Sequence, residues 1–348
     1  MMVYAQTSLI SGLCVAVVFF VAPTRAIAHH GVGAQFDLSQ TIELQGEIKE
    51  LIWRNPHVRL TVSVVDASGD EILWAGEGMS IPSLRQREVT EVLLDVGDQI
   101  TLAGNPAHDG ENELYVTNVL LPNGREVLFT GNAEPRWQGL VMGSTGPAFE
   151  TIGDASLPEL GLFRVWSVRQ PRIWQNFDFE IFPLSAEARA EGEAYDRLSD
   201  APRGGECAPP GMPQIVTANP YPRDFVDRGD TILMRLEHYD TIRTIHLTPL
   251  PSNTEPLPSP LGYSVGHWND DTLAVTTTKI SDGKFRLGIS LSENVETVER
   301  FTVTVDGSRL DYQMTVIDPT VLLEPAEFET HWVYIPGISV ESFDCFGG

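Results

Sequence analysis

Short stretches in which apolar and polar residues alternate constrain the fold of this chain more than any other feature. The alternation runs through residues 42–48 and again through residues 58–64. A period of two residues is typical of strands with one buried face. A further strand at 71–75, a helix at 81–94 and strands at 99–103 and 114–121 complete this region. Three strands, one helix and two strands predict a five-stranded barrel of the OB type.

The last third of the chain predicts strands again, with few helices between them. The clearest strands are residues 231–238, 241–248, 272–279, 295–305 and 309–317. Asp306-Gly307 is a typical hairpin turn between the last two. We therefore expect an all-β protein whose C-terminal part is an antiparallel, lipocalin-like barrel with a ligand cavity, or alternatively a sandwich.

The segment between these two regions differs from both in composition. Prolines are scattered through it together with Trp137, Trp166 and Trp174, which suggests a strap packed on a domain rather than a free linker. One helix is expected at 185–197, with Ser185 as its N-cap. The predicted division is residues 1–28, 29–130 (OB-like), 131–206 (strap) and 207–348 (second barrel).

The N-terminus carries an apolar run at residues 9–22, followed by the small-residue sequence Ala26-Ile27-Ala28. A run this short before such a site predicts a cleavable signal peptide covering residues 1–28 rather than a membrane span. We therefore expect a periplasmic or secreted protein that has no stable membrane insertion after cleavage.

Cleavage at that site would leave two cysteines, Cys207 and Cys345, because Cys14 lies inside the signal. Two cysteines in an exported protein predict one disulfide. The alternative is a pair of free thiols.

The charge balance excludes some partners. Lys plus Arg number 23 against 48 Asp plus Glu, which gives a net charge of −25. Nucleic-acid binding needs clustered Lys and Arg, and so does docking on anionic lipid. We therefore expect neither, and nothing in the sequence fixes the oligomeric state.

The predicted C-terminal barrel carries the best candidates for a ligand site. If Asp240 lies at a hairpin turn, Glu237 and Arg243 can meet on paired strands and hold a polar group of a ligand. The residues that we expect to line the pocket are Glu237, Arg243, His246, His267 and Trp268. The first expectation is a binding protein for a small, partly apolar ligand. The alternative is an enzyme without a cofactor that uses His267 as the base, with Arg243 and Glu237.

The histidines near the predicted cleavage site raise a different possibility. Cleavage after Ala28 would give His29 a free α-amine, so that His29, His30 and His57 could bind copper. The simpler interpretation is that His29 and His30 are exposed at a chain end. His57 also belongs to the sequence Trp53-Arg54-Asn55-Pro56-His57, where Pro56 predicts a bend in the strand. For that bend we favour a structural role over a ligand wall.

Several motifs resemble those of a family of exported bacterial proteins of unknown function. The first is the Trp-x-Asn-Pro-His sequence at residues 53–57, and the second is Asp-Thr-x-Arg-Thr-Ile-His-Leu at residues 240–247. Gly262 to Trp268 adds a third matching stretch. The resemblance implies an N-terminal OB-like domain and a C-terminal β domain. It implies no activity, so a module that only binds other envelope proteins stays a further possibility.

Overall fold

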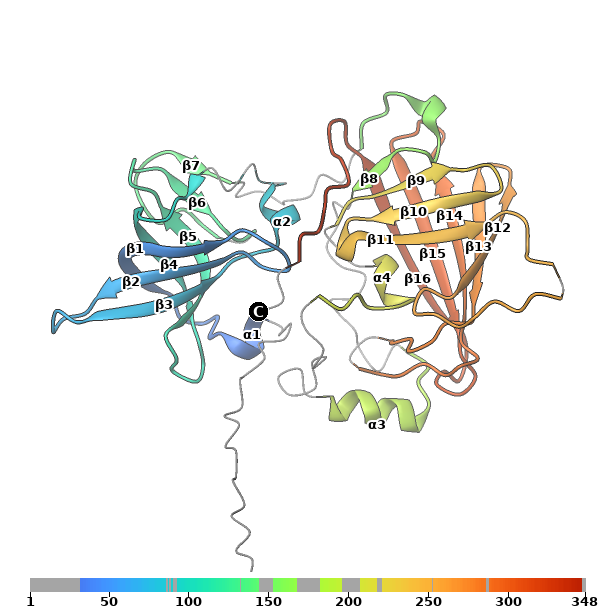
Figure 1. Ribbon diagram of the computed structural model, residues 1–348, viewed down its shortest axis with the longest axis horizontal. Helices are drawn as coiled ribbons and strands as arrows, with labels where there is room; N and C mark the ends of the chain where they lie inside the picture. The colour runs from blue at the N-terminus through green and yellow to red at the C-terminus, as the bar shows by residue number, and fades with distance from the viewer. Residues whose placement is uncertain are drawn as a thin grey trace, which may run out of the picture.

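The computed structural model contains two β-barrels that lie side by side, and residues 335–345 run between them (Figure 1). It describes residues 32–345, except residues 86, 88, 90–92, 132, 144–152, 168–181, 196–206, 218–220, 252 and 286–287. His29 and His30 lie outside the described residues, as does the predicted signal peptide.

The first barrel is closed by five strands in the order β1-β2-β3-β5-β4. β3 and β5 pair in parallel and so complete the ring, while β6 and β7 continue the sheet beyond β5. The elements of this half are α1 (Val32–Gln35), β1 (Ile42–Ile52), β2 (Arg59–Val65), β3 (Glu71–Glu77), α2 (Ile81–Arg85), β4 (Gln99–Pro106), β5 (Glu113–Leu120), β6 (Glu126–Leu128) and β7 (Val141–Met142). The OB-like prediction is confirmed.

One long strand, β1, belongs to both sides of this barrel. Its first half pairs with β4 and its second half with β2, and the register shifts between Ile48 and Glu50. Gly46 lies where both pairings overlap, and a Cβ there would stand 2.2 Å from the carbonyl oxygen of Ser63. Only glycine fits such a close approach of two backbones. The closed ring therefore depends on the absence of a side chain at this position.

The helix between β3 and β4 is much shorter than the sequence predicts. α2 ends at Arg85, because the Leu84 carbonyl accepts the amides of both Arg87 and Val89 and so turns the chain back. Residue 89 and residues 93–94 are not α-helical. What remains is a single turn that carries Arg85 toward the second barrel.

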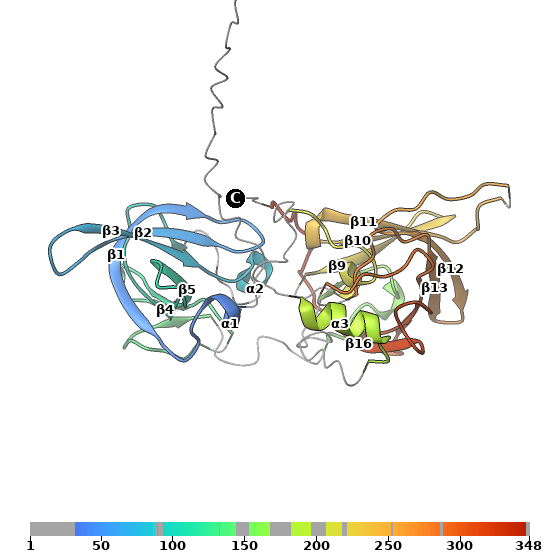
Figure 2. The same cartoon turned by 90° about the horizontal axis from the view of Figure 1, so that it is seen from below.

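The second barrel is a closed ring of the strands β10-β11-β12-β13-β14-β15-β16-β8-β9 (Figure 2). Its strands are β8 (Val165–Ser167), β9 (Arg223–Asp227), β10 (Thr231–Leu236), β11 (Thr241–His246), β12 (Tyr263–Asn269), β13 (Thr272–Thr278), β14 (Glu296–Val303), β15 (Arg309–Ile317) and β16 (Ala326–Tyr334). The helical elements are η2 (Pro158–Leu160), α3 (Ala186–Ala194), α4 (Gln214–Thr217) and η3 (His238–Asp240). The expected barrel is therefore present, rather than a sandwich.

Two features of this ring differ from the prediction. β11 and β12 pair in parallel through Ile245 with Ser264, so the ring is not wholly antiparallel. β8 comes from the predicted strap and closes the ring between β16 and β9, with Trp166 fully buried in the core. Ser185 does cap its helix as expected, because its hydroxyl accepts the amide of Ala188 at 3.3 Å.

A disulfide joins Cys207 to Cys345, whose Cα atoms lie 5.7 Å apart. The predicted pairing is confirmed. The bond links the chain ahead of α4 to the segment that follows the last strand, across 138 residues of sequence.

Candidate functional site

A buried carboxylate lies at the junction of the two barrels. Glu237 follows the last residue of β10 and begins the tight corner η3, and its side chain is only 1% exposed. Its own amide donates to the Pro222 carbonyl, at 3.0 Å. The same corner holds Tyr239 and Asp240 at φ values of 57° and 49°. Left-handed backbone at two consecutive non-glycine residues is uncommon and tends to occur at functional sites.

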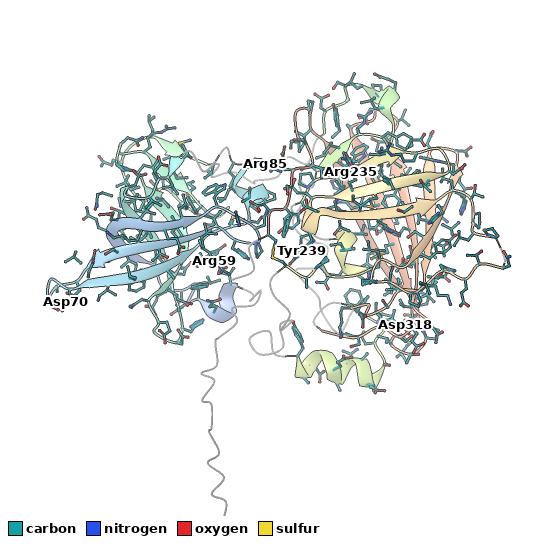
Figure 3. The ribbon with its side chains drawn as sticks, in the orientation of Figure 1. Arg59, Asp70, Arg85, Arg235, Tyr239 and Asp318 are labelled. Carbon is teal, nitrogen blue, oxygen red and sulfur yellow. A yellow bond between two sulfur atoms is a disulfide. The ribbon has the colours of Figure 1, made fainter. Side chains whose placement is uncertain are left out.

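The partner of Glu237 comes from the first barrel. Nη2 of Arg85, at the end of α2, donates to both carboxylate oxygens of Glu237, at 3.0 and 2.8 Å. The Arg85 side chain is 35% exposed, whereas its partner is buried. Figure 3 labels Arg85 and Tyr239 at the junction of the two barrels. One end of the pair is therefore fixed inside the protein while the other is open to solvent.

Residues 335–345, here called the C-terminal segment, run between the barrels and contact both (Figure 1). The amide of Glu341 donates to Glu237 Oε2, and the amide of Phe343 donates to Asp240 Oδ1, both at 3.0 Å. From the first barrel, Nδ2 of Asn55 donates to the Phe343 carbonyl at 2.5 Å. The disulfide at Cys345 adds a covalent anchor to these hydrogen bonds.

Aromatic rings fill the space next to the buried carboxylate. The rings of Tyr221 and His238 stack at 4.2 Å, and the rings of Tyr239 and Phe343 lie 4.5 Å apart. Burial raises the pKa of Tyr221 far above its usual range, although a hydrogen bond with Ser80 of the first barrel opposes the shift. The Tyr221 phenol therefore stays protonated and can act as a hydrogen-bond donor.

Burial also dominates the electrostatics of Glu237. It raises the pKa of this carboxyl, because a charged group is poorly solvated there, and the nearby Arg85 guanidinium opposes the shift. A carboxyl with a raised pKa beside an arginine is a feature that functional sites share with structural ion pairs. The geometry around the pair must therefore distinguish the two.

That geometry includes a cavity. Its volume is about 260 Å³, and it is lined by Arg85, Pro222, Gly337, Ile338, Ser339 and Glu341. One wall is thus supplied by α2 of the first barrel, one by the residue before β9, and one by the C-terminal segment. The lining combines one cation with two apolar side chains, a hydroxyl and a carboxylate.

The structure does not bring the five predicted ligand-binding residues together. His246 and His267 lie on the outer face of the barrel wall, where His246 contacts the ring of Tyr263 at 5.0 Å and His267 is exposed. Trp268 lies at the end of β12 against Phe163. Of the five, only Glu237 belongs to the junction between the barrels.

The predicted pair of Glu237 and Arg243 is not formed, because each has another partner. Arg243 points into the second barrel and forms an ion pair with Glu299. Its Nε donates to Ser264 at 3.0 Å, its Nη2 donates to Thr277 at 2.7 Å, and Tyr312 donates to Glu299 at 2.8 Å. All five of these side chains are at most 1% exposed. They form a closed polar network in the barrel interior.

Few signals in the sequence indicate the residues that do line the cavity. Arg85 lies in a stretch where a long helix was expected, and the side chain that it meets is 152 residues away in sequence. Pro336-Gly337 is a turn signal after the last strand. It indicates where the C-terminal segment leaves the barrel but not where that segment goes.

The predicted copper ligands are only partly described. Nδ1 of His57 lies 3.0 Å from the Gly78 carbonyl and 3.4 Å from Glu77 Oε1, so this histidine contributes to the structure of the first barrel. Among residues that the structure describes, no group of three or more His, Cys, Asp or Glu side chains is arranged to hold a metal ion.

Comparison with known proteins gives one similarity. Residues 17–115 match a model described as a family of unknown function (DUF6152). The match covers the end of the predicted signal region, from residue 17, and most of the first barrel. Searches among curated proteins and among solved structures found no match. No helix in the described part of the chain has the length and apolar character needed to span a membrane.

Proposed function

We propose that the protein binds a small, partly apolar molecule in the cavity between the barrels, with an acidic or hydrogen-bond-accepting group of that molecule against Arg85. The observation that supports this most directly is the unequal exposure of the Arg85–Glu237 pair beside a cavity of about 260 Å³. Ligand sites are concave, mostly apolar and fixed by a few well-placed polar groups.

Arg85 has donors left for a ligand. An arginine side chain carries five N–H groups, and Glu237 uses only the Nη2 end. No described residue accepts a hydrogen bond from Nε or Nη1 of Arg85. Because Glu237 holds the guanidinium in place, a ligand would meet donors that are already positioned, which lowers the entropy lost on binding.

The lining also suggests the size and polarity of the ligand. A volume of about 260 Å³ is below the range of pockets that hold drug-sized molecules, about 300–1,000 Å³. Pro222 and Ile338 offer apolar contacts, whereas Ser339 offers a hydroxyl. A small carboxylate with a short apolar body would match these contacts.

Native mass spectrometry of the full chain, compared with its denatured mass, tests the proposal. Arg85→Met combined with Glu237→Gln removes the pair without leaving a buried charge unpaired. A matched control is Arg235→Met with Asp224→Asn, which removes an arginine–aspartate pair that does not line the cavity. We expect the wild type and the control to retain the same organic mass and the cavity variant to lose it.

A wild type that carries no adduct would then be screened by thermal shift against small aliphatic and aromatic carboxylates. We expect at least one of them to raise the Tm of the wild type and of the control but not that of the cavity variant. An adduct or a Tm shift that the cavity variant keeps would contradict the proposal, and so would a screen without any shift.

We also propose that the chain is exported and acts in the periplasm or outside the cell. The apolar run before Ala28 and the disulfide support this, because disulfides persist in oxidising compartments. The denatured mass is the test: a chain that starts at His29 agrees with cleavage after Ala28. The native mass of the same protein examines the copper hypothesis for His29 and His30, which requires that N-terminus and one bound copper ion.

A further inference from the structure

Five exposed apolar side chains lie together at one end of the second barrel. They are here called the apolar patch, and their exposed fractions range from 37% to 102%: Leu157, Leu160, Phe163, Trp268 and Val305. The rings of Phe163 and Trp268 meet edge to face, with centroids 6.3 Å apart. Exposed apolar groups that cluster in this way indicate an interaction site more strongly than scattered ones.

The elements that carry the patch are held against each other. Nη1 of Arg164 donates to the Gly307 carbonyl at 3.1 Å, which joins the η2 loop to the turn between β14 and β15. The turn between β12 and β13 is at the same end, because Thr272 bonds to Thr302 at 2.8 Å. Three separate connections therefore form one surface.

A buried arginine makes the loop of this surface rigid. Arg164 is 5% exposed and donates to four backbone carbonyls, those of Ser156, Leu157, Gly161 and Gly307. Its guanidinium also lies over the rings of Trp166 and Tyr334. The apolar side chains of the loop are thus preorganised, which reduces the entropy that a partner must overcome on binding.

Acidic side chains border the patch. Glu159 adjoins Leu160, Asp270 and Asp271 follow Trp268, and Asp306 adjoins Val305; all four are exposed. The one arginine of the η2 loop, Arg164, is turned inward and does not offset them. A surface of this kind is complementary to apolar side chains flanked by cations, and it repels anionic lipid.

We infer that the apolar patch is a docking site for a protein segment that presents aromatic or aliphatic side chains between Lys or Arg residues. Phe163 and Trp268 receive the apolar side chains, and Asp270 and Asp271 attract the flanking cations. This site is separate from the cavity between the barrels and does not depend on a ligand there.

The test uses a phage-displayed library of random peptides, selected on the full-length protein. Enriched peptides are synthesised, and their affinity is measured by fluorescence anisotropy. We expect them to combine Trp, Phe or Leu with Lys or Arg. The double variant F163S/W268S should weaken their binding by at least about tenfold, as loss of aromatic hot spots does. D270N/D271N should weaken the binding by a smaller factor than F163S/W268S does. That factor should be larger at low salt than at high salt, because salt screens exposed charges.

Two controls separate the patch from exposed apolar and acidic groups in general. L257S changes an exposed leucine in the connection between β11 and β12. Ser259 of this connection forms a β-bridge with Ile280, which lies beyond the end of β13 opposite the patch. E324Q/E327Q removes two exposed acids ahead of and within β16. Neither control should alter the affinity, and circular dichroism shows whether every variant is folded.

Three results would overturn the inference. One is a selection that enriches peptides without cations. Another is equal binding of the enriched peptides by wild type and F163S/W268S. The third is binding to phosphatidylglycerol vesicles that F163S/W268S abolishes, because the patch would then be a lipid-binding surface.

Discussion

Two arginine–glutamate pairs in this protein have the same chemistry but different surroundings. Inside the second barrel, Arg243 and Glu299 are both at most 1% exposed, and Ser264, Thr277 and Tyr312 complete their hydrogen bonds. Between the barrels, Glu237 is equally buried, but a third of the Arg85 side chain is exposed beside a cavity. The first pair is closed, and the second is open on one side.

This difference separates a buried ion pair that is structural from one that suits the proposed binding. A buried pair with all partners in place contributes mainly a unique arrangement of the strands around it, and removal of one member leaves an uncompensated charge. A pair with spare donors facing a cavity can accept one more group without losing its internal partner. Glu237 and Arg243 were predicted to form one site, whereas Arg243 belongs to the closed pair and Glu237 to the open one.

The largest expected effect concerns the disulfide that anchors the C-terminal segment next to the open pair. Cys345→Ser should lower the free energy of unfolding by about 4–5 kcal/mol on the chain-entropy model, because the bond closes a long loop. Cys207→Ser should have the same effect, and the double variant should lose nothing more. Urea unfolding followed by circular dichroism measures all three; additive losses would show that the two thiols act independently.

A direct comparison of the pairs gives the next largest effect. Arg243→Leu should cost about 3–5 kcal/mol, because Glu299 would stay buried without its partner. Arg85→Leu should cost less, since its guanidinium is already partly solvated and Glu237 can take up a proton. Arg243→Met with Glu299→Gln should restore part of the loss. If Arg85→Leu is the more destabilising variant in urea unfolding, the distinction between a closed and an open pair fails.

Asn55 offers a smaller test of how the cavity is held together. Asn55→Ala should cost about 1–3 kcal/mol, because its buried amide links the first barrel to Phe343. Asn105→Ala is the matched control, since Nδ2 of Asn105 bonds to the Gln40 carbonyl within the first barrel. Hydrogen exchange should increase in residues 337–345 for the Asn55 variant alone. Equal exchange in both variants would show that the bond does not position the C-terminal segment.

The pH dependence of stability gives the smallest effect. Burial raises the folded-state pKa of Glu237 above its ordinary value of 4.5. The folded state therefore binds this proton more tightly than the unfolded chain, and the associated stabilisation is present below about pH 4.5 and lost as the pH rises through the raised pKa. The free energy of unfolding of the wild type, relative to Glu237→Gln, should fall with rising pH and then level off.

Glu255 supplies a control of opposite sign. Its hydrogen bond with Lys279 lowers the pKa of this exposed carboxyl. The stabilisation that this hydrogen bond contributes is therefore present above the ordinary pKa of the carboxyl. It is lost as the pH falls through the lowered pKa of the folded state. Relative to Glu255→Gln, the wild type should gain stability as the pH rises toward about 4.5. If the stability of the wild type relative to Glu237→Gln also rose with pH, burial would not control the pKa of Glu237.

Local patterns in the sequence were enough to predict much of the fold. Alternation identified β1 and β2, the Asp306-Gly307 turn identified a hairpin, and the cysteine count identified the disulfide. The strand and turn signals each reside in a few neighbouring residues. The disulfide was predictable because two remaining cysteines allow a single pairing. The strand β8 was missed because three residues in a proline-rich stretch carry no recognisable period.

The site was harder to predict because its contacts join distant parts of the chain. The partner of Glu237 could not be found from the residues around it, since Arg85 reaches it from another barrel. The same holds for Arg243, whose partner Glu299 lies 56 residues away on a strand that is not adjacent to β11. Periodicity predicts which side of a strand is buried, but it does not predict which strands face each other across a barrel.

The closure of the second barrel by β8 and β16 has a consequence for how the protein folds. These strands are separated by more than 150 residues, so the ring is completed only when two remote segments meet. A pairing between such distant segments forms slowly, because the entropy of closing a long loop is lost before the contacts are gained. The cavity follows later still, since it needs both finished barrels. During refolding, the proposed binding at the cavity should therefore return after the secondary structure does.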